Sequence, residues 1–195
     1  IIMSTSINEI KERNARSYKL ILLFAMVSMF MMFAGLTSAF VVSKSRTDWV
    51  KDFQLPSAFY FSTAAILCCS ITFHLAKKAI QKDKRSAATS FLLATFALGI
   101  VFVILQFVGF RQIVDSGYFF TGSASSITTT FLYIVTIVHL AHLAGGLISL
   151  LIIIYNHFKQ KYNSTQTLGI ELGAMYWHFL DFLWVYLFLF LYFFK

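Results

Sequence analysis

Long apolar runs alternate with short polar segments along this chain, and each run is long enough to cross a bilayer. About 20 apolar residues are needed for a helix to span the hydrocarbon core. Runs of this length cover residues 20–43, 57–76, 88–111, 128–156 and 173–194. We therefore predict an all-α protein, an integral membrane bundle of five transmembrane helices in a single domain over residues 1–195.

The polar segments between the runs add detail to this prediction. Residues 6–19 are rich in charge, and we expect them to form a helix at the membrane surface. Pro56 directly precedes the run 57–76, which suits the start of a helix. The longest connection, 112–127, contains glycines and a Ser/Thr cluster. We expect it to lie across the surface as a short cap.

Composition and charge support a membrane protein. The chain is 58% hydrophobic and 12% charged, whereas soluble domains carry about 25% charged residues. The formal net charge is +8, but the basic residues lie between apolar runs and form no aromatic-interleaved patch, so we expect no nucleic-acid partner. Lys and Arg are most numerous in the segments that share a side with the N-terminus. The positive-inside rule then predicts the N-terminus inside and the C-terminus outside.

The last apolar run contains an imidazole and a carboxylate. His178 and Asp181 are three residues apart and share a helix face, while Trp177 and Trp184 flank them on a neighbouring stripe. Ionisable groups at membrane depth cost about 2.5–3.5 kcal/mol each on insertion scales and seldom face lipid. We therefore expect another helix to lie against this face.

Glu171 precedes His178 by two helical turns, so Glu171, His178 and Asp181 lie along one side of the last helix. One interpretation is a proton relay. The other is structural, with Glu171 as a first-turn acid favoured by the helix dipole and the other two bonded to each other or to a neighbouring helix. Spacing favours the structural interpretation.

Bound haem b is the sharpest cofactor hypothesis, because several histidines lie in or near the predicted helices. His139 and His142 share a face and are followed by Gly145 and Gly146, a small pair that could admit a porphyrin edge or allow close helix packing. No two predicted helices present matched histidines at equal depth. The remaining histidines, near helix ends or in the last helix, are His74, His157 and His178. We expect no haem in this chain.

Other chemistry is also poorly supported by the residue pattern. A copper or zinc site needs three or four converging His, Cys or carboxylate ligands, and no such set is evident. No nucleophile turn or glycine-rich phosphate loop is present either. Cys68 and Cys69 are adjacent within an apolar run, and we interpret both as small core residues. We therefore expect no catalytic, cofactor-binding or metal-binding residues in this chain.

Several segments resemble one known membrane family. The segment Glu171-x4-Tyr176-Trp177-His178-Phe179-Leu180-Asp181-x2-Trp184 closely resembles the last helix of subunit III of haem-copper terminal oxidases. Further similar segments are Phe33-Ala34-Gly35 with Ala39-Phe40, Ser62-Thr63 with Leu67-Cys68-Cys69-Ser70, Leu98-Gly99 with Phe102 and Leu105-Gln106, and His139-Leu140-Ala141-His142 with Gly146. The resemblance covers roughly residues 20 to 194, and the length matches the short five-helix bacterial form.

The chain departs from the family pattern at points that bear on function. As a short form it is expected to lack the first two helices of the longer members, which hold phospholipids in a cleft, so bound phospholipid is expected here without that cleft. Met29 and Phe30 stand where the family has a buried glutamate, which argues against proton buffering by that helix. Gly109 occupies the region of a second family glutamate.

The resemblance implies a non-redox accessory subunit of a proton-pumping oxidase in the bacterial plasma membrane. Haems and copper would belong to partner subunits, and subunit I would be the main contact, with other oxidase subunits and membrane lipids around it. Membership of a respiratory supercomplex is left open. The intramembrane polar residues are then structural: Glu171, His178, Asp181, Trp177, Trp184, His139 and His142. Alternatives are a nitric oxide reductase-associated subunit of the same family, or a five-helix haem b anchor that hands electrons to quinone.

Overall fold

The computed structural model describes residues 2–46, 49, 54–120, 126–162 and 167–194, and these residues form helices and no β-strand. Five long helices follow one another along the chain: α1 (Ile2–Val42), α2 (Ser57–Gln81), α3 (Arg85–Asp115), α4 (Ile127–Phe158) and α5 (Leu168–Phe194), with a short 3₁₀ helix, η1 (Ser43–Ser45), after α1. All five contain stretches long and apolar enough to cross a membrane. The predicted all-α bundle of five spans is confirmed.

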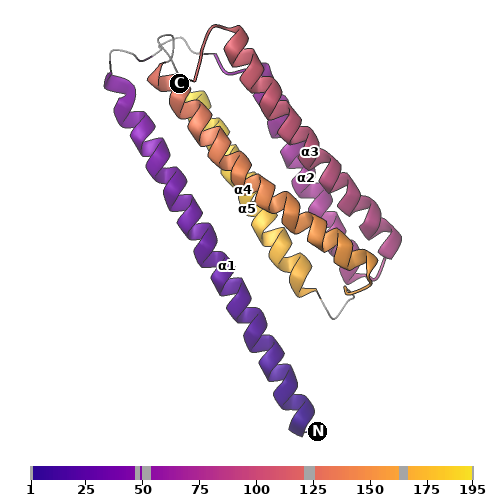
Figure 1. Ribbon diagram of the computed structural model, residues 1–195. Coiled ribbons are helices and arrows are strands. Elements are labelled where there is room, and N and C mark those ends of the chain that lie inside the picture. Colours follow the sequence, from indigo (N-terminus) through magenta and orange to yellow (C-terminus); the bar gives the residue numbers. More distant parts are fainter. Residues whose placement is uncertain (1, 47–48, 50–53, 121–125, 163–166, 195) are drawn as a thin grey trace.

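Each helix extends beyond the apolar run that predicted it. Helix α1 is the longest, with 41 residues, which corresponds to roughly 60 Å at 1.5 Å per residue. It includes the charged segment 6–19, and its N-terminal part projects beyond the other helices in Figure 1. The prediction that this segment is helical is confirmed.

The helices run up and down, with α4 and α5 between α1 on one side and the α2–α3 pair on the other (Figure 1). Helices α2 and α3 form a tight hairpin, because only residues 82–84 connect them. Asp83 adopts a left-handed φ of 54° in that turn, a conformation that Asp tolerates better than most residues. Helix α1 packs on α4 and α5.

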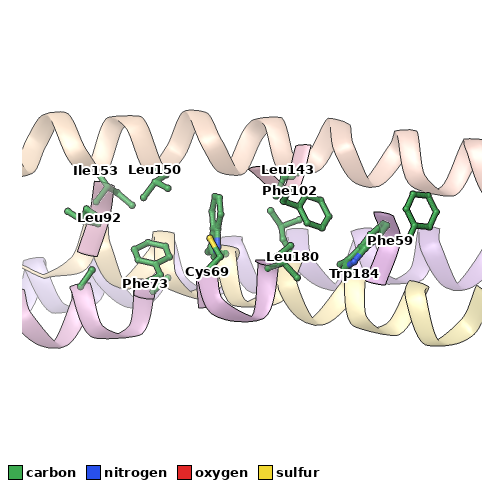
Figure 2. Close-up of a cluster of buried hydrophobic side chains, with 14 of the residues drawn as sticks. Phe59, Cys69, Phe73, Leu92, Phe102, Leu143, Leu150, Ile153, Leu180 and Trp184 are labelled. Atoms are coloured by element: carbon green, nitrogen blue, oxygen red, sulfur yellow. The ribbon is translucent and has the colours of Figure 1, made fainter. Parts of the chain in front are cut away.

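Aromatic side chains fill the centre of the bundle. Figure 2 shows Phe59, Phe102 and Trp184 towards one end of the cluster, with Leu143, Leu180, Cys69 and Phe73 continuing along the helices. The rings of Phe102 and Trp184 are 5.1 Å apart and nearly perpendicular, at 89°, an arrangement that aromatic pairs favour. Trp184 is almost fully buried. Trp184 of α5 is therefore enclosed by aromatic side chains from α2 and α3.

Small residues let these bulky rings approach neighbouring helices. A Cβ on Gly109 of α3 would overlap the Phe59 ring of α2. A Cβ on Gly99 would lie 3.3 Å from the Trp177 ring of α5. Small residues serve the same purpose at many membrane helix interfaces. Gly109, one of the departures from the family pattern, is thus a packing position.

Two local predictions need correction. Cys69 is buried, and its Sγ lies 3.2 Å from the Thr95 carbonyl oxygen, but Cys68 is exposed on the outside of α2. The prediction that both are core residues was wrong for Cys68, because successive helical side chains differ by about 100° in direction. The expected cap 112–127 is shorter than predicted, since α3 continues to Asp115. Residues 121–125 of that segment lie outside the described residues.

Candidate functional site: polar residues inside the bundle

Glu171 lies in the first turn of α5 and connects this helix to α1. One of its carboxylate oxygens accepts a hydrogen bond of 2.6 Å from Nζ of Lys19. The other accepts one of 2.6 Å from the hydroxyl of Thr167, the residue that precedes α5. The described contacts of Glu171 are thus with α1 and its own N-terminal turn, and none joins it to His178 or Asp181.

His178 lies deeper in α5 and faces α2. Its Nδ1 shares a 2.7 Å hydrogen bond with the hydroxyl of Ser70, and the side chain is 37% exposed. Asp181 is one turn further, with its side chain 5% exposed and Oδ2 at 3.9 Å from Nδ1 of His178. The imidazole and the carboxylate are therefore close, but the short bond of His178 is to another helix.

The Asp181 carboxylate is buried without a geometrically good hydrogen bond from any described residue. A buried polar group in this state costs about 1–3 kcal/mol, and more when charged. The Ser70 hydroxyl lies near this carboxylate as well, although its short bond is to His178. Asp181 therefore depends on the polar surroundings that α2 provides.

The two tryptophans are almost fully buried and hold α5 against other helices. Nε1 of Trp184 donates a 3.0 Å hydrogen bond to the Thr63 hydroxyl of α2. Trp177 packs on Phe73 of α2, with the rings 6.0 Å apart. Both side chains thus fix the α2–α5 contact on either side of the His178 level.

His139 and His142 are in different environments although they share a face of α4. His139 is fully buried, with its ring 5.1 Å from that of Trp184 and 6.0 Å from that of Phe102. No described residue hydrogen-bonds to either of its ring nitrogens. Nδ1–H of His142 donates to the Val138 carbonyl at 2.7 Å. The two imidazoles are thus held separately, one by aromatic rings and one by its own helix.

The surroundings of Gly146 show whether Gly145 and Gly146 leave room for a porphyrin edge or allow close helix packing. A Cβ at this position would lie 2.8 Å from the Leu180 side chain and 3.4 Å from the Trp177 ring of α5. The space over Gly146 is therefore filled by protein, as in close helix packing. Gly145 is less crowded, with the Tyr176 hydroxyl 3.6 Å from such a Cβ.

The remaining histidines lie nearer one end of the bundle. The His157 Nε2 shares a 2.9 Å hydrogen bond with the Thr89 hydroxyl of α3. His74 is exposed on α2, with its ring 6.4 Å from that of His178. Within the described part of the chain, no three His, Cys, Asp or Glu side chains form a group that could hold a metal ion.

Some polar contacts could not be identified from the sequence alone. Nε2 of Gln106 on α3 donates a 2.9 Å hydrogen bond to the buried Ser62 hydroxyl on α2. Both residues occur in the segments that resemble the oxidase family, but the pattern did not indicate that they pair. The partners Lys19 and Ser70 were likewise missed, because nothing in local spacing links them to α5.

Comparison with known proteins identifies the family. A family profile described as Cytochrome c oxidase subunit III matches residues 12–195. Cytochrome c oxidase subunit 3 of Spodoptera frugiperda is 31% identical over 144 residues, which cover 72% of this chain and 89% of that protein. The Drosophila melanogaster protein of the same name is 31% identical over 144 residues, covering 72% of this chain and 50% of its own length.

A vertebrate relative gives the same result. Cytochrome c oxidase subunit 3 of Petromyzon marinus is 28% identical over 143 residues, covering 73% of this chain and 51% of its own. The chain spans about half the length of most of the curated relatives it matches. The five long helices fit this match, and the chain belongs to the cytochrome c oxidase subunit III family.

Proposed function

We propose that this chain is a non-redox accessory subunit of a proton-pumping haem-copper terminal oxidase. The observation that carries the proposal is the family match over nearly the whole chain. The polar groups within the helices support it, because Glu171, Ser70, Thr63 and Gln106 all bond between helices or cap one. Their role is to hold the bundle in one arrangement beside the catalytic subunit.

In this proposal the haems and copper reside in partner subunits, with subunit I as the main contact. The chain steadies subunit I, its proton-uptake route and its access to oxygen through lipid. The membrane is the bacterial plasma membrane, with the N-terminus inside and the C-terminus outside. The basic residues near the ends of α2 and α4 and in the α2–α3 turn support this orientation.

Affinity purification of the chain from its own membranes tests the proposal. We expect subunit I and other oxidase subunits to co-purify, identified by mass spectrometry. The purified chain alone should show no reduced-minus-oxidised haem b band. Co-purification with nitric oxide reductase subunits would favour the alternative within the family. A haem b band that is lost in His139→Ala or His178→Ala would instead support a quinone-linked anchor.

A bound phospholipid is part of the proposal. A groove of about 590 Å³ runs between α1, α4 and α5, and its lining is mostly apolar, including Ile21, Ala25 and Met29. Met29, one of the two residues where the family has a glutamate, is thus an apolar wall of this groove. An acyl chain fits such a lining, because it requires no polar partner.

Lipid analysis of the purified complex tests this part. Ala25→Trp fills the groove and should lower the amount of co-purified phospholipid. Ile104→Trp, at a position 55% exposed on α3, should leave it unchanged. Equal lipid content in the two variants would contradict a lipid site in the groove.

A further inference from the structure

A small groove opens on the outside of the bundle between α2 and α5. Its volume is about 270 Å³, and it is lined by Ser70, Ile71, His74, Leu75 and His178. We call it the α2–α5 groove. The exposed ring of His74 forms one wall, and the partly exposed ring of His178 forms the other.

The groove lies at membrane depth. His178 is roughly 15 Å from the first residue of α5, and Ser70 is a similar distance from the last residue of α2, at 1.5 Å per residue. Measured from the ends of the apolar runs 57–76 and 173–194, Ser70 lies roughly 9 Å and His178 roughly 8 Å inside the hydrocarbon core, whereas His74 lies near its edge, one turn from Lys77. A lipid headgroup would lie closer to the helix ends, near Lys77 and Lys78.

Acyl chains do not complement the imidazoles of this groove. Acyl chains offer no hydrogen-bond partner, and ionisable residues in membrane helices usually face protein or a water-filled cavity. His74 has no hydrogen bond from any described residue, and only Nδ1 of His178 is bonded. One ring nitrogen of His178 thus has no described partner inside the core, and the imidazole of His74 has none near its edge. Acyl chains can satisfy neither group, whereas an acceptor on a neighbouring helix can.

The charges around the groove indicate what would fit it. Lys77 lies one turn from His74 on α2 and is close enough to His178 to interact with it electrostatically. The nearest acid, Asp181, is buried behind His178 with its Oδ2 at 3.9 Å from the ring nitrogen. The outward face therefore offers donors and positive potential, which complement a carboxylate or carbonyl acceptor.

From this arrangement we infer that the α2–α5 groove docks a transmembrane helix of a neighbouring oxidase subunit, which places a carboxylate or carbonyl acceptor between His74 and His178. The inference rests on the proposed function and specifies which face of the bundle meets a partner. The apolar residues Ile71 and Leu75 beside the histidines provide the packing surface for such a helix.

Photo-crosslinking in the intact complex tests the inference. A photoreactive residue is introduced at Ile71, which is 61% exposed on α2, or at Ile148, which is 60% exposed on α4 at a similar distance from the helix end. We expect position 71 to crosslink to another membrane subunit at higher yield than position 148. If position 71 crosslinks to lipid alone while oxidase subunits still co-purify, the docking inference is wrong and the proposed function stands. Failure of any oxidase subunit to co-purify would instead count against the proposed function.

A second measurement tests the hydrogen bond inferred between His74 and the acceptor on the partner helix. Interhelical hydrogen bonds in membranes contribute about 0.6–1.7 kcal/mol, which corresponds to roughly threefold to twentyfold in an equilibrium constant. His74→Leu should therefore speed loss of the chain from the purified complex within that range, whereas His74→Gln, which keeps a donor, should lose less. His74 is exposed, so both variants should fold. If the His74→Leu chain is lost from the complex no faster than the wild-type chain, the inference is wrong.

Discussion

Helix α1 and the α2–α3 hairpin are attached to the bundle in different ways. The hairpin is held along its length by buried polar bonds, such as Gln106 to Ser62 at 2.9 Å and the Thr95 hydroxyl to that of Thr72 at 2.9 Å. Helix α1 relies on a few widely spaced anchors. It bonds through Lys19, near the middle of the helix, and through Thr37, near its C-terminal end, whose hydroxyl is 2.8 Å from that of Tyr186.

The difference shows how helices in a membrane can associate without a strong hydrophobic driving force between them. In lipid, close packing and interhelical hydrogen bonds replace much of the force that water supplies in soluble proteins. The hairpin uses both along its whole contact. Besides its polar anchors, α1 depends on Phe33 and Phe40, two buried rings packed against α4 and α5. Substitutions should therefore affect the two regions unequally.

The largest effect is expected at the glycine contact inside the hairpin. Gly109→Leu places a side chain where the Phe59 ring lies, and such overpacking typically costs about 1–3 kcal/mol, occasionally more. We expect a lower yield of folded protein and a lower Tm in detergent. Gly35→Leu on α1 is the matched control, because a Cβ there meets nothing within 4 Å. Similar losses in the two variants would remove the proposed difference.

A cavity in the α1 contact should have the next largest effect. Phe33 is fully buried, and Phe→Ala changes in protein cores cost about 3–5 kcal/mol. We expect a smaller loss here, below that of Gly109→Leu, because α1 has fewer contacts with the bundle and can shift to fill the space. The Tm of Phe33→Ala should fall clearly below that of Phe24→Ala, whose side chain is 71% exposed on the same helix. Equal Tm values would show that α1 packing contributes little.

The buried hydrogen bond between α2 and α3 can be measured separately. Ser62→Ala leaves Gln106 without its acceptor, and Gln106→Leu removes the donor. A double-mutant cycle isolates the pair, and we expect a coupling free energy of about 0.6–1.7 kcal/mol. Thermal unfolding of the four proteins provides it. Additive effects would mean that the bond does not stabilise the hairpin.

The smallest effect is expected at the ion pair between α1 and α5. Lys19→Met removes the 2.6 Å contact with Glu171, and because the pair is partly exposed the loss should be about 0.2–1 kcal/mol and should shrink in high salt. Arg16→Met is the control, since its 3.6 Å contact with Glu12 is far more exposed. A salt-independent loss in Lys19→Met would indicate that packing of the lysine stem, not charge, is responsible.

The sequence predicted the helices well because the length of an apolar run is a direct requirement of the bilayer. It predicted the ends less well: the run 57–76 ends before Lys77, whereas α2 continues to Gln81. Lysine side chains can extend to the interface while the backbone stays helical. The length of an apolar run therefore predicts the membrane span but underestimates the length of the helix.

The polar contacts were less predictable because they join residues distant in the chain. Spacing indicated that His178 and Asp181 share a face, but the bond from Ser70 depends on how α2 lies against α5. Glu171 and Lys19 are 152 residues apart, and no local periodicity relates them. The direction of Cys68 was missed for a simpler reason, since composition alone does not say which side of a helix faces outward.

The two adjacent cysteines have opposite chemical accessibility. The thiol of Cys68 lies on the outside of α2, on the same stripe as Ile71 and Leu75, while that of Cys69 is enclosed by the α2–α3 contact. A membrane-permeant alkylating reagent should therefore react with the first in the isolated chain and with the second only after the hairpin opens. Two adjacent residues of one helix thus provide two natural labels. Cys68 reports whether a partner covers α2, and Cys69 reports unfolding of the hairpin.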